Sequence, residues 1–185
     1  MTTSARPSRR GLIGTVLLVA IVTAAVLSWQ WWDRSQEGEF SSDPKFCELV
    51  ASETIHRLVP ESYGGREDIA SCTWAAPREK GKYRAGVHLF ASRLIVDLAR
   101  EDMREMRAND ELVWEKDTVE DLPDLGDVAF LRFPPTLGTS ITAQVTFRRS
   151  NLVVSLAYTR SDDDRQAARA GAIDAARDTV ARLRP

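Results

Sequence analysis

The stretch ITAQVTFRRSNLVVSLAY, residues 141–158, decides the fold class of this 185-residue chain. Apolar side chains, all but Ala143 large, occur at every second position from Ile141 to Phe147, and again from Leu152 to Tyr158. A period of two is typical of a half-buried strand, and the intervening Arg149-Ser150-Asn151 is typical of a turn. The stretch therefore predicts an antiparallel hairpin with one buried face.

Further segments with helix or strand periodicity lie on both sides of this hairpin. They predict helices at residues 44–59, 92–108 and 161–184, and strands at 71–75, 83–89, 112–119 and 127–133. The mixture of helices with strands that follow one another along the chain predicts an α+β fold. We expect a largely antiparallel sheet packed by two to three helices and preceded by one transmembrane helix.

Two of these helices carry specific expectations about capping and burial. Helical spacing in 92–108 predicts that Ile95 and Leu98 lie on its buried side. The last helix is expected to begin at a capping box formed by Ser161 and Asp164, and to bury Ala170 with other apolar residues at helical spacing.

The N-terminal part of the chain has a different character from the rest. Residues 11–32, GLIGTVLLVAIVTAAVLSWQWW, carry no charge, and a helix of this length spans about 33 Å against a hydrocarbon core of about 30 Å. Arg9 and Arg10 precede this segment, and Trp29, Trp31 and Trp32 end it, as expected for the two interfaces of a membrane. The segment therefore predicts a retained signal-anchor that crosses the membrane once.

This anchor divides the chain into four parts. We expect a basic cytoplasmic tail at 1–10, a transmembrane helix at 11–32, a tether at 33–43 and an extracytoplasmic domain at 44–185, because arginines favour the cytoplasmic side. The alternative is a cleaved signal peptide and a secreted domain, since Val22-Thr23-Ala24 resembles a cleavage site. Both interpretations place the domain outside the cytoplasm.

The chain has two cysteines, Cys47 and Cys72, and both follow the predicted anchor. An even pair in an oxidising compartment favours one disulfide over two free thiols or a catalytic cysteine. Neither cysteine belongs to a Cys-x-x-Cys motif, and we expect a metal site to need more soft ligands than these two thiols with His56 and His88.

Charge and motifs exclude several classes of function. Residues 33–185 contain 22 basic and 27 acidic side chains, a net charge of −5, and show no basic patch for nucleic acid. No catalytic or nucleotide-binding motif is found, so we predict no enzyme activity, metal or cofactor. The remaining candidates for catalysis or metal binding have structural explanations. His56 and His88 are isolated histidines, and Asp162, Asp163 and Asp164 are carboxylates at the start of a helix. An acidic loop that we expect to be solvated contains Glu120, Asp121, Asp124 and Asp127.

Four short motifs in a fixed order resemble an actinobacterial envelope family known as domain of unknown function 3558. They are FCEL at 46–49, SCTW at 71–74, DLGDVAF at 124–130 and FRRSNLVV at 147–154. The resemblance covers residues 44–183 and implies a compact extracytoplasmic domain with a groove, similar to sensor domains of some actinobacterial kinases and to PsbP-type folds. Many members resemble lipoproteins, whereas this chain has no lipid-accepting cysteine, which affects the anchor and not the domain.

These features together predict a non-catalytic, membrane-anchored accessory domain of the cell envelope. Its expected partner is an envelope protein, or a small apolar ligand held in a groove between sheet and helices beside Trp74. The alternative is an envelope hydrolase with an unrecognised site built from scattered Ser, His and Asp residues.

Overall fold

The computed structural model describes the backbone of residues 9–79, 82–83, 85–113, 119–135 and 140–185, and the side chains of 18–77, 85–109, 119–135 and 140–185. The chain forms two compact units, Met1–Glu37 and Gly38–Pro185. Each unit is described by itself below.

The first unit is the helix α1, Arg9–Glu37. It includes all of the segment 11–32, and the rings of Trp29 and Trp32 meet edge to face with their centroids 6.4 Å apart. Trp29, Trp31 and Trp32 are exposed. Among the helices as far as their side chains are described, none is long and apolar enough to cross a membrane.

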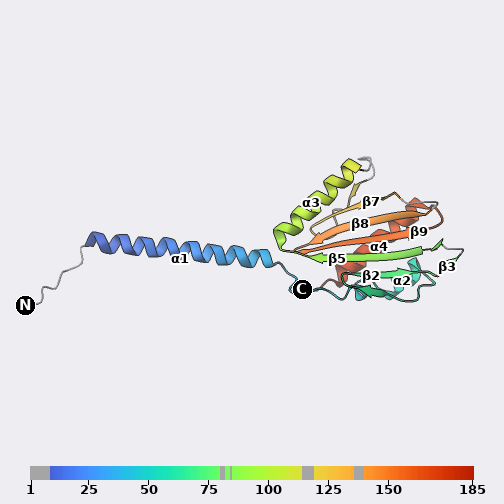
Figure 1. Cartoon of the computed structure of the whole chain (residues 1–185), viewed down its shortest axis with the longest axis horizontal. Coiled ribbons are helices and arrows are strands. Elements are labelled where there is room, and N and C mark those ends of the chain that lie inside the picture. Colours follow the sequence, from blue (N-terminus) through green and yellow to red (C-terminus); the bar gives the residue numbers. More distant parts are fainter. Residues whose placement is uncertain (1–8, 80–81, 84, 114–118, 136–139) are drawn as a thin grey trace, which may run out of the picture. The chain divides into compact units, whose positions relative to one another are not determined.

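The second unit is built around a seven-stranded antiparallel sheet in the order β1-β2-β5-β9-β8-β7-β6 (Figure 1). The strands are β1 Arg66–Asp68, β2 Ser71–Ala75, β5 Ala85–Arg93, β6 Glu120–Asp121, β7 Val128–Arg132, β8 Ile141–Arg149 and β9 Leu152–Arg160. A separate pair, β3 Arg78–Glu79 and β4 Lys82–Tyr83, forms a short ribbon. This architecture confirms the α+β prediction.

The hairpin of β8 and β9 lies near the middle of the sheet, as the sequence predicted. Phe147 pairs with Val154 and Val145 with Leu156, and all four side chains are fully buried on one face. Ser150 takes a positive φ of 53° at the turn, a conformation that a short reversal often requires.

Helices cover the two faces of the sheet unequally. On one face lie the 3₁₀ turn η1 Phe46–Glu48, the helix α2 Ser52–Leu58 and the helix α4 Arg165–Arg182, which pack on the main core. The helix α3 Val96–Val113 packs on the other face in a small separate cluster. In Figure 1 α4 passes behind the strands.

The predicted helix at 44–59 is in fact two short pieces. Ala51, with φ −61° and ψ 140°, is extended and separates η1 from α2. The first piece contacts β1, β2 and β5, whereas the second contacts α4 and β5. Because of this break, the apolar residues of both pieces, such as Phe46 of η1 and Ile55 of α2, are buried in the core.

The predicted boundaries and buried faces of α3 and α4 need correction. Residues through Arg93 remain paired with β9, so α3 begins at Val96, and both Ile95 and Leu98 are exposed. The helix also continues to Val113, into the strand predicted at 112–119, of which residues 114–118 lie outside the described residues.

The last helix begins with a single cap and packs through small residues. The carboxylate of Asp164 accepts a hydrogen bond from the Ala167 amide at 2.9 Å, so Asp164 is itself the N-cap, and Ala170 is exposed. Gly171 faces the sheet, where a Cβ atom would lie 2.5 Å from the ring of Tyr158. The small residues of α4 therefore let its backbone approach the sheet closely.

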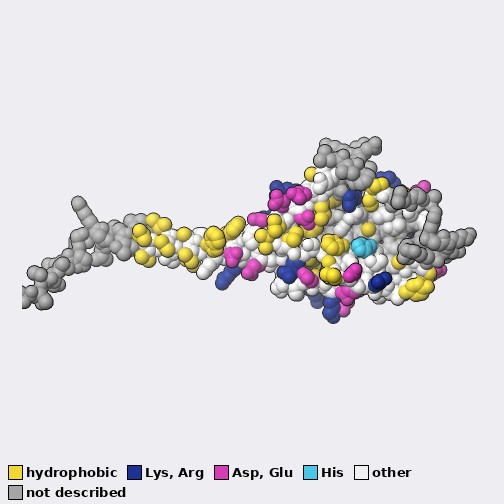
Figure 2. Space-filling model, viewed as in Figure 1, with side chains coloured by type: hydrophobic (Ala, Val, Ile, Leu, Met, Phe, Trp, Pro, Cys, Tyr) yellow, Lys and Arg dark blue, Asp and Glu magenta, His cyan; other side chains and the backbone are white. Residues whose placement is uncertain are grey.

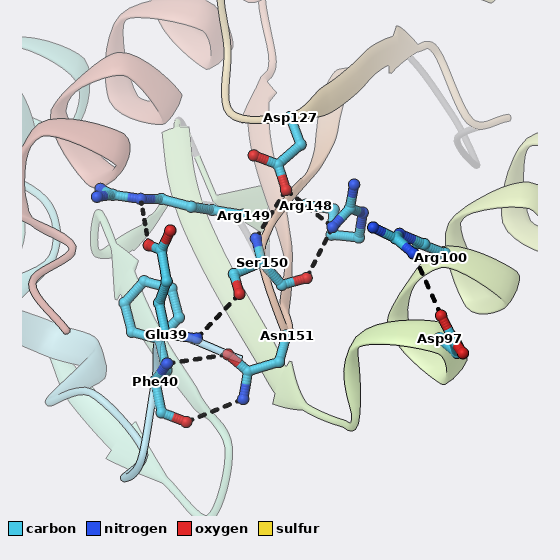
Figure 3. A network of polar contacts seen from close by, with 9 residues as sticks. All are labelled: Glu39, Phe40, Asp97, Arg100, Asp127, Arg148, Arg149, Ser150 and Asn151. Atoms are coloured by element: carbon cyan, nitrogen blue, oxygen red, sulfur yellow. Dashed lines mark hydrogen bonds and ion pairs between the residues drawn. The ribbon is translucent and has the colours of Figure 1, made fainter. Parts of the chain in front are cut away.

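The segment that the sequence predicted as a tether contributes to the core. Phe40 is only 2% exposed, and the side chain of Asn151, 1% exposed, bonds both backbone groups of Phe40 (Figure 3). The Glu39 amide also donates to Ser150 Oγ at 2.9 Å, and the guanidinium of Arg149 lies over the Phe40 ring. The folded unit thus starts at Gly38, and its first residues are bound to the turn between β8 and β9.

Candidate functional site

The most distinctive surface of the domain is the face of the sheet that α4 does not cover. Strand alternation places Val87 and Leu89 of β5 in the main core, so His88 and Phe90 lie on the opposite face. We call this the open face, and define it by the side chains of β2, β5, β9, β8 and β7 that point away from α4. They are Ser71, Thr73, Ala75, Gly86, His88, Phe90, Ser92, Val153, Ser155, Ala157, Thr159, Thr142, Gln144, Thr146, Arg148, Val128, Phe130 and Arg132.

The helix α3 covers one corner of this side of the sheet. Ala99 and Met103 of α3 pack on Phe130 and Val153, and these four residues form a cluster separate from the main core. In the described part of the chain, no helix other than α3 packs on this side of the sheet. His88 and Phe90 are exposed there, whereas Thr142 and Thr146 are only 9% and 2% exposed.

A network of side-chain hydrogen bonds crosses the open face from β7 to β9. The guanidinium of Arg132 donates twice to Gln144 Oε1, at 3.2 and 3.0 Å. The Gln144 amide in turn donates to Ser155 Oγ, which also lies 3.4 Å from Thr146 Oγ1. Because Arg132 fixes the amide orientation of Gln144, this row of polar groups is ordered before any ligand arrives.

A second polar contact lies one row further along the strands. Thr142 and Thr159 face each other across β8 and β9, and their hydroxyl oxygens are 2.8 Å apart. Each hydroxyl can both donate and accept, so the pair retains hydrogen-bonding capacity beyond the bond that it makes.

The centre of the open face also carries an exposed aromatic ring. Phe90 is 42% exposed and lies between Ser71 of β2 and Ser155 of β9. The neighbouring exposed residue on the same strand is His88, between Thr73 and Ala157. Figure 2, viewed from the side away from α4, shows hydrophobic side chains there in small separate patches among polar ones.

Carboxylates stand at the edges of the open face and are absent from its interior. Strands β2, β5, β9 and β8 place no acidic residue on it. Asp121 of the edge strand β6 is paired with Arg107 of α3, and Asp68 of the opposite edge strand lies beside Arg66. The interior therefore combines hydroxyl, amide, guanidinium and imidazole groups without a fixed negative charge.

The predicted disulfide is present between Cys47 and Cys72, with their Cα atoms 5.2 Å apart. It connects η1 to β2 on the covered face, beside the buried indole of Trp74, which is 4% exposed. Gly65 approaches all three groups so closely that a Cβ atom there would lie within 3 Å of the indole nitrogen and both sulfurs. The surroundings of Trp74 are thus filled by protein.

A surface hollow of about 570 Å³ lies near the disulfide, and its lining is mixed. It is formed by η1 and its flanking residues together with the end of α4, and charged Lys45, Glu48 and Arg182 line it beside apolar Leu49 and Val50. Trp74 does not line it, and the charged groups make it a poor match for a small apolar ligand.

The acidic loop predicted as solvated is held by arginines from three different elements. Glu120 pairs with Arg169 of α4, Asp121 with Arg107 of α3, and Asp127 with Arg148 of β8 at 2.8 Å. The hydrogen bond from Arg169 lowers the pKa of Glu120 below its ordinary value. These pairs use the loop's carboxylates for attachment, and no group of three potential metal ligands occurs among the described residues.

The remaining candidates are separated in space. His56 is exposed on α2, which packs on the covered face, while His88 lies on the open face, so the two histidines cannot act as a pair. Asp164 caps α4, and Asp162 binds Arg160, whose hydrogen bond lowers the Asp162 pKa to about 2. Asp162 and Asp164 thus have structural roles.

The open face was not predicted from the sequence. Polar residues alternate with apolar ones at Thr142, Gln144 and Thr146, but the solvent-facing side of any half-buried strand has the same pattern. Only the strand order, which brings β7 and β5 to the two sides of the hairpin, shows that Arg132 and Phe90 belong to the same surface.

No family model matches this chain, and no curated protein matches it. A solved structure from Bacteroides thetaiotaomicron VPI-5482 matches with a TM-score of 0.41 and 13% identity, covering 60% of this chain and 40% of that one. The chain thus spans less than half of that protein, and this distant likeness carries no argument about function.

Proposed function

We propose that this protein is a membrane-anchored, extracytoplasmic accessory domain that binds a component of the cell envelope without catalysing a reaction. The observation that carries the proposal is the open face, a broad polar surface whose side chains are already ordered by the Arg132, Gln144 and Ser155 network. Preorganised polar groups lower the entropic cost of binding, which is the usual advantage of a rigid sheet as a binding surface.

The chemistry of the open face supports binding more than catalysis. The hydroxyls of Thr142 and Thr159 bond to each other, and that of Ser155 bonds to the Gln144 amide. His88 lies opposite Thr73, and strands β2, β5, β9 and β8 place no carboxylate on this face to orient the imidazole as a base. The same polar lining supports a hydrogen-bonding partner over the small apolar ligand that the sequence suggested. A hydrolase would need a site assembled elsewhere, and neither histidine provides its centre.

Location and anchoring are part of the same proposal. The uncharged segment 11–32, bracketed by arginines and tryptophans, supports a single crossing with the N-terminus inside. A disulfide is typical of proteins exposed to an oxidising compartment, which supports an extracytoplasmic domain. The motifs at 46–49, 71–74, 124–130 and 147–154 support membership of the actinobacterial envelope family named above.

Binding can be tested with two matched substitutions on opposite faces of the sheet. Ala157 lies in the middle of the open face, and Ala170 is exposed on α4. The purified full chain is mixed with the insoluble envelope fraction of the expressing cells and sedimented. We expect Ala157→Arg to reduce the bound fraction at least tenfold, and Ala170→Arg to leave it unchanged. Equal binding by both variants would overturn the open face as the binding surface.

Topology needs a separate measurement on intact cells. Protease added outside should digest the domain while a cytoplasmic marker remains intact, and the digestion should not require lysis. Protection of the domain until lysis would refute the extracytoplasmic location.

A further inference from the structure

We propose that the open face binds a saccharide, with one sugar ring stacked on Phe90 and its hydroxyls bonded to the neighbouring polar side chains. This inference rests on the proposed function and names the chemical class of its ligand. Two features of the open face carry it: the ring of Phe90, which is 42% exposed, and the hydroxyl and imidazole groups beside it, which are partly or fully exposed.

Phe90 is unusual because of its surroundings as much as its exposure. The residues directly opposite it in the sheet are Ser71 and Ser155, both small and polar, so its ring stands above its neighbours. An apolar protein partner would need a contiguous hydrophobic patch. The apolar residue of β9 diagonal to Phe90 is Val153, which is buried under α3, so the neighbouring strands add little exposed apolar surface. A sugar ring needs no apolar surface larger than one aromatic ring, because its C–H face is apolar while its hydroxyls project around the rim.

The polar groups nearest to Phe90 match those hydroxyls in kind. Ser71 and Ser155 lie directly opposite it, Thr73 and His88 follow in the next row, and that row continues across Ala157 to Gln144 and Arg132. Hydroxyl groups act as donor and acceptor at once, and the planar amide and guanidinium offer fixed donors. Neighbouring strands lie about 4.8 Å apart, so successive hydroxyls of one sugar can meet side chains of adjacent strands.

The charge pattern narrows the ligand further. Because the interior of the open face has no carboxylate and contains Arg132 and His88, it accepts neutral or carboxylated sugars and disfavours cationic ones. A polypeptide partner would more naturally use free backbone edges, whereas β1 and β6, the two edges of this sheet, are only three and two residues long.

The experiment titrates the full chain with defined saccharides. The protein is purified in a detergent without a sugar head group, and chitotetraose, maltotetraose and a uronic acid tetramer are the probes, followed by saturation-transfer NMR and calorimetry. We expect at least one probe to bind, and Phe90→Ala to weaken its binding about tenfold, as loss of an aromatic contact does. Phe90→Tyr should retain binding because the ring remains.

A matched control and separate outcomes keep the result interpretable. Tyr63 is an 86% exposed aromatic residue before β1 and outside the open face, so Tyr63→Ala should leave binding unchanged. If no probe binds while Ala157→Arg still abolishes binding to the envelope fraction, the saccharide inference is overturned and the proposed function stands. If a probe binds equally to Phe90→Ala, the position of the sugar is wrong. If the Ala157→Arg variant binds the envelope fraction as well as the unmodified chain does, the proposed function is refuted instead.

Discussion

Replacing Phe40 by alanine tests the finding that the folded domain begins before residue 44. The ring of Phe40 is 2% exposed and belongs to the main core, and its backbone bonds to Asn151 at 3.0 and 2.9 Å. Truncation of a buried phenylalanine to alanine in a packed core lowers the free energy of unfolding by about 3–5 kcal/mol. We therefore expect Phe40→Ala to lower the free energy of unfolding by that amount.

The size of this effect depends on how the segment responds. Removal of the ring leaves a cavity beneath the guanidinium of Arg149, which lies 5.8 Å from the ring centroid. The bonds to Asn151 hold the backbone of the segment in place, so the cavity cannot collapse easily. For a folded unit of this size, the expected loss corresponds to a fall in Tm of about 6–20 °C.

The assay is urea unfolding of the full chain with its disulfide intact, followed by the fluorescence of tryptophan. Phe90→Ala is the matched control, because it removes the same side chain from an exposed position and should cost less than about 1 kcal/mol. If Phe40→Ala costs no more than Phe90→Ala, residues 38–43 form a free tether and the attachment to the hairpin turn is refuted.

Three further predictions concern stability. Gly171→Ala should destabilise the domain by about 1–3 kcal/mol, because the new methyl would collide with the ring of Tyr158; an unchanged unfolding midpoint would show that α4 can shift away. The disulfide joins two cysteines that are 25 residues apart in the sequence. Its reduction should lower the free energy of unfolding, measured by heat or urea, by about 3–4 kcal/mol, and a much smaller loss would indicate a compact unfolded chain. The Asp162 pKa is lowered to about 2 in the folded protein, so its contribution to stability is present above the ordinary pKa and disappears as the pH falls from about 4 to 2. Asp162→Asn should remove this part of the pH dependence, and high salt should weaken it, since the carboxylate is exposed; an identical acid profile in the variant would contradict the assignment.

The parts of the fold that the sequence predicted well depend on local periodicity. The strict alternation from Ile141 to Phe147 could only bury one face of a strand, and the structure confirms the resulting hairpin. The disulfide was likewise predictable, because the two cysteines of the chain allow only one intramolecular pairing. In both cases a short stretch of sequence contains all the information needed.

The parts that it missed depend on contacts between distant segments. Phe40 was assigned to a tether because nothing around it is periodic, and its burial requires Asn151, which lies 111 residues away. Similarly, Leu98 has the spacing of a buried residue, yet α3 covers only a corner of the sheet and leaves that side chain exposed. The face that α4 buries is set by small residues, whose close packing hydrophobicity alone does not predict.

The candidate site was the least predictable feature for the same reason. The bonds of Arg132, Gln144 and Ser155 join three consecutive strands, but the position of this network beside Phe90 of β5 follows only from the strand order of the sheet. Polar side chains on a half-buried strand otherwise indicate only contact with water.

The most direct test of the open face is photo-cross-linking from its centre in intact cells. A benzophenone amino acid replaces Phe90 in one full-length variant and Tyr63 in a second, and both variants are irradiated under identical conditions. Our account predicts a covalent adduct with envelope material at position 90, digestible by glycan-degrading enzymes, and none at position 63. Adducts at position 63 with none at position 90 would contradict it.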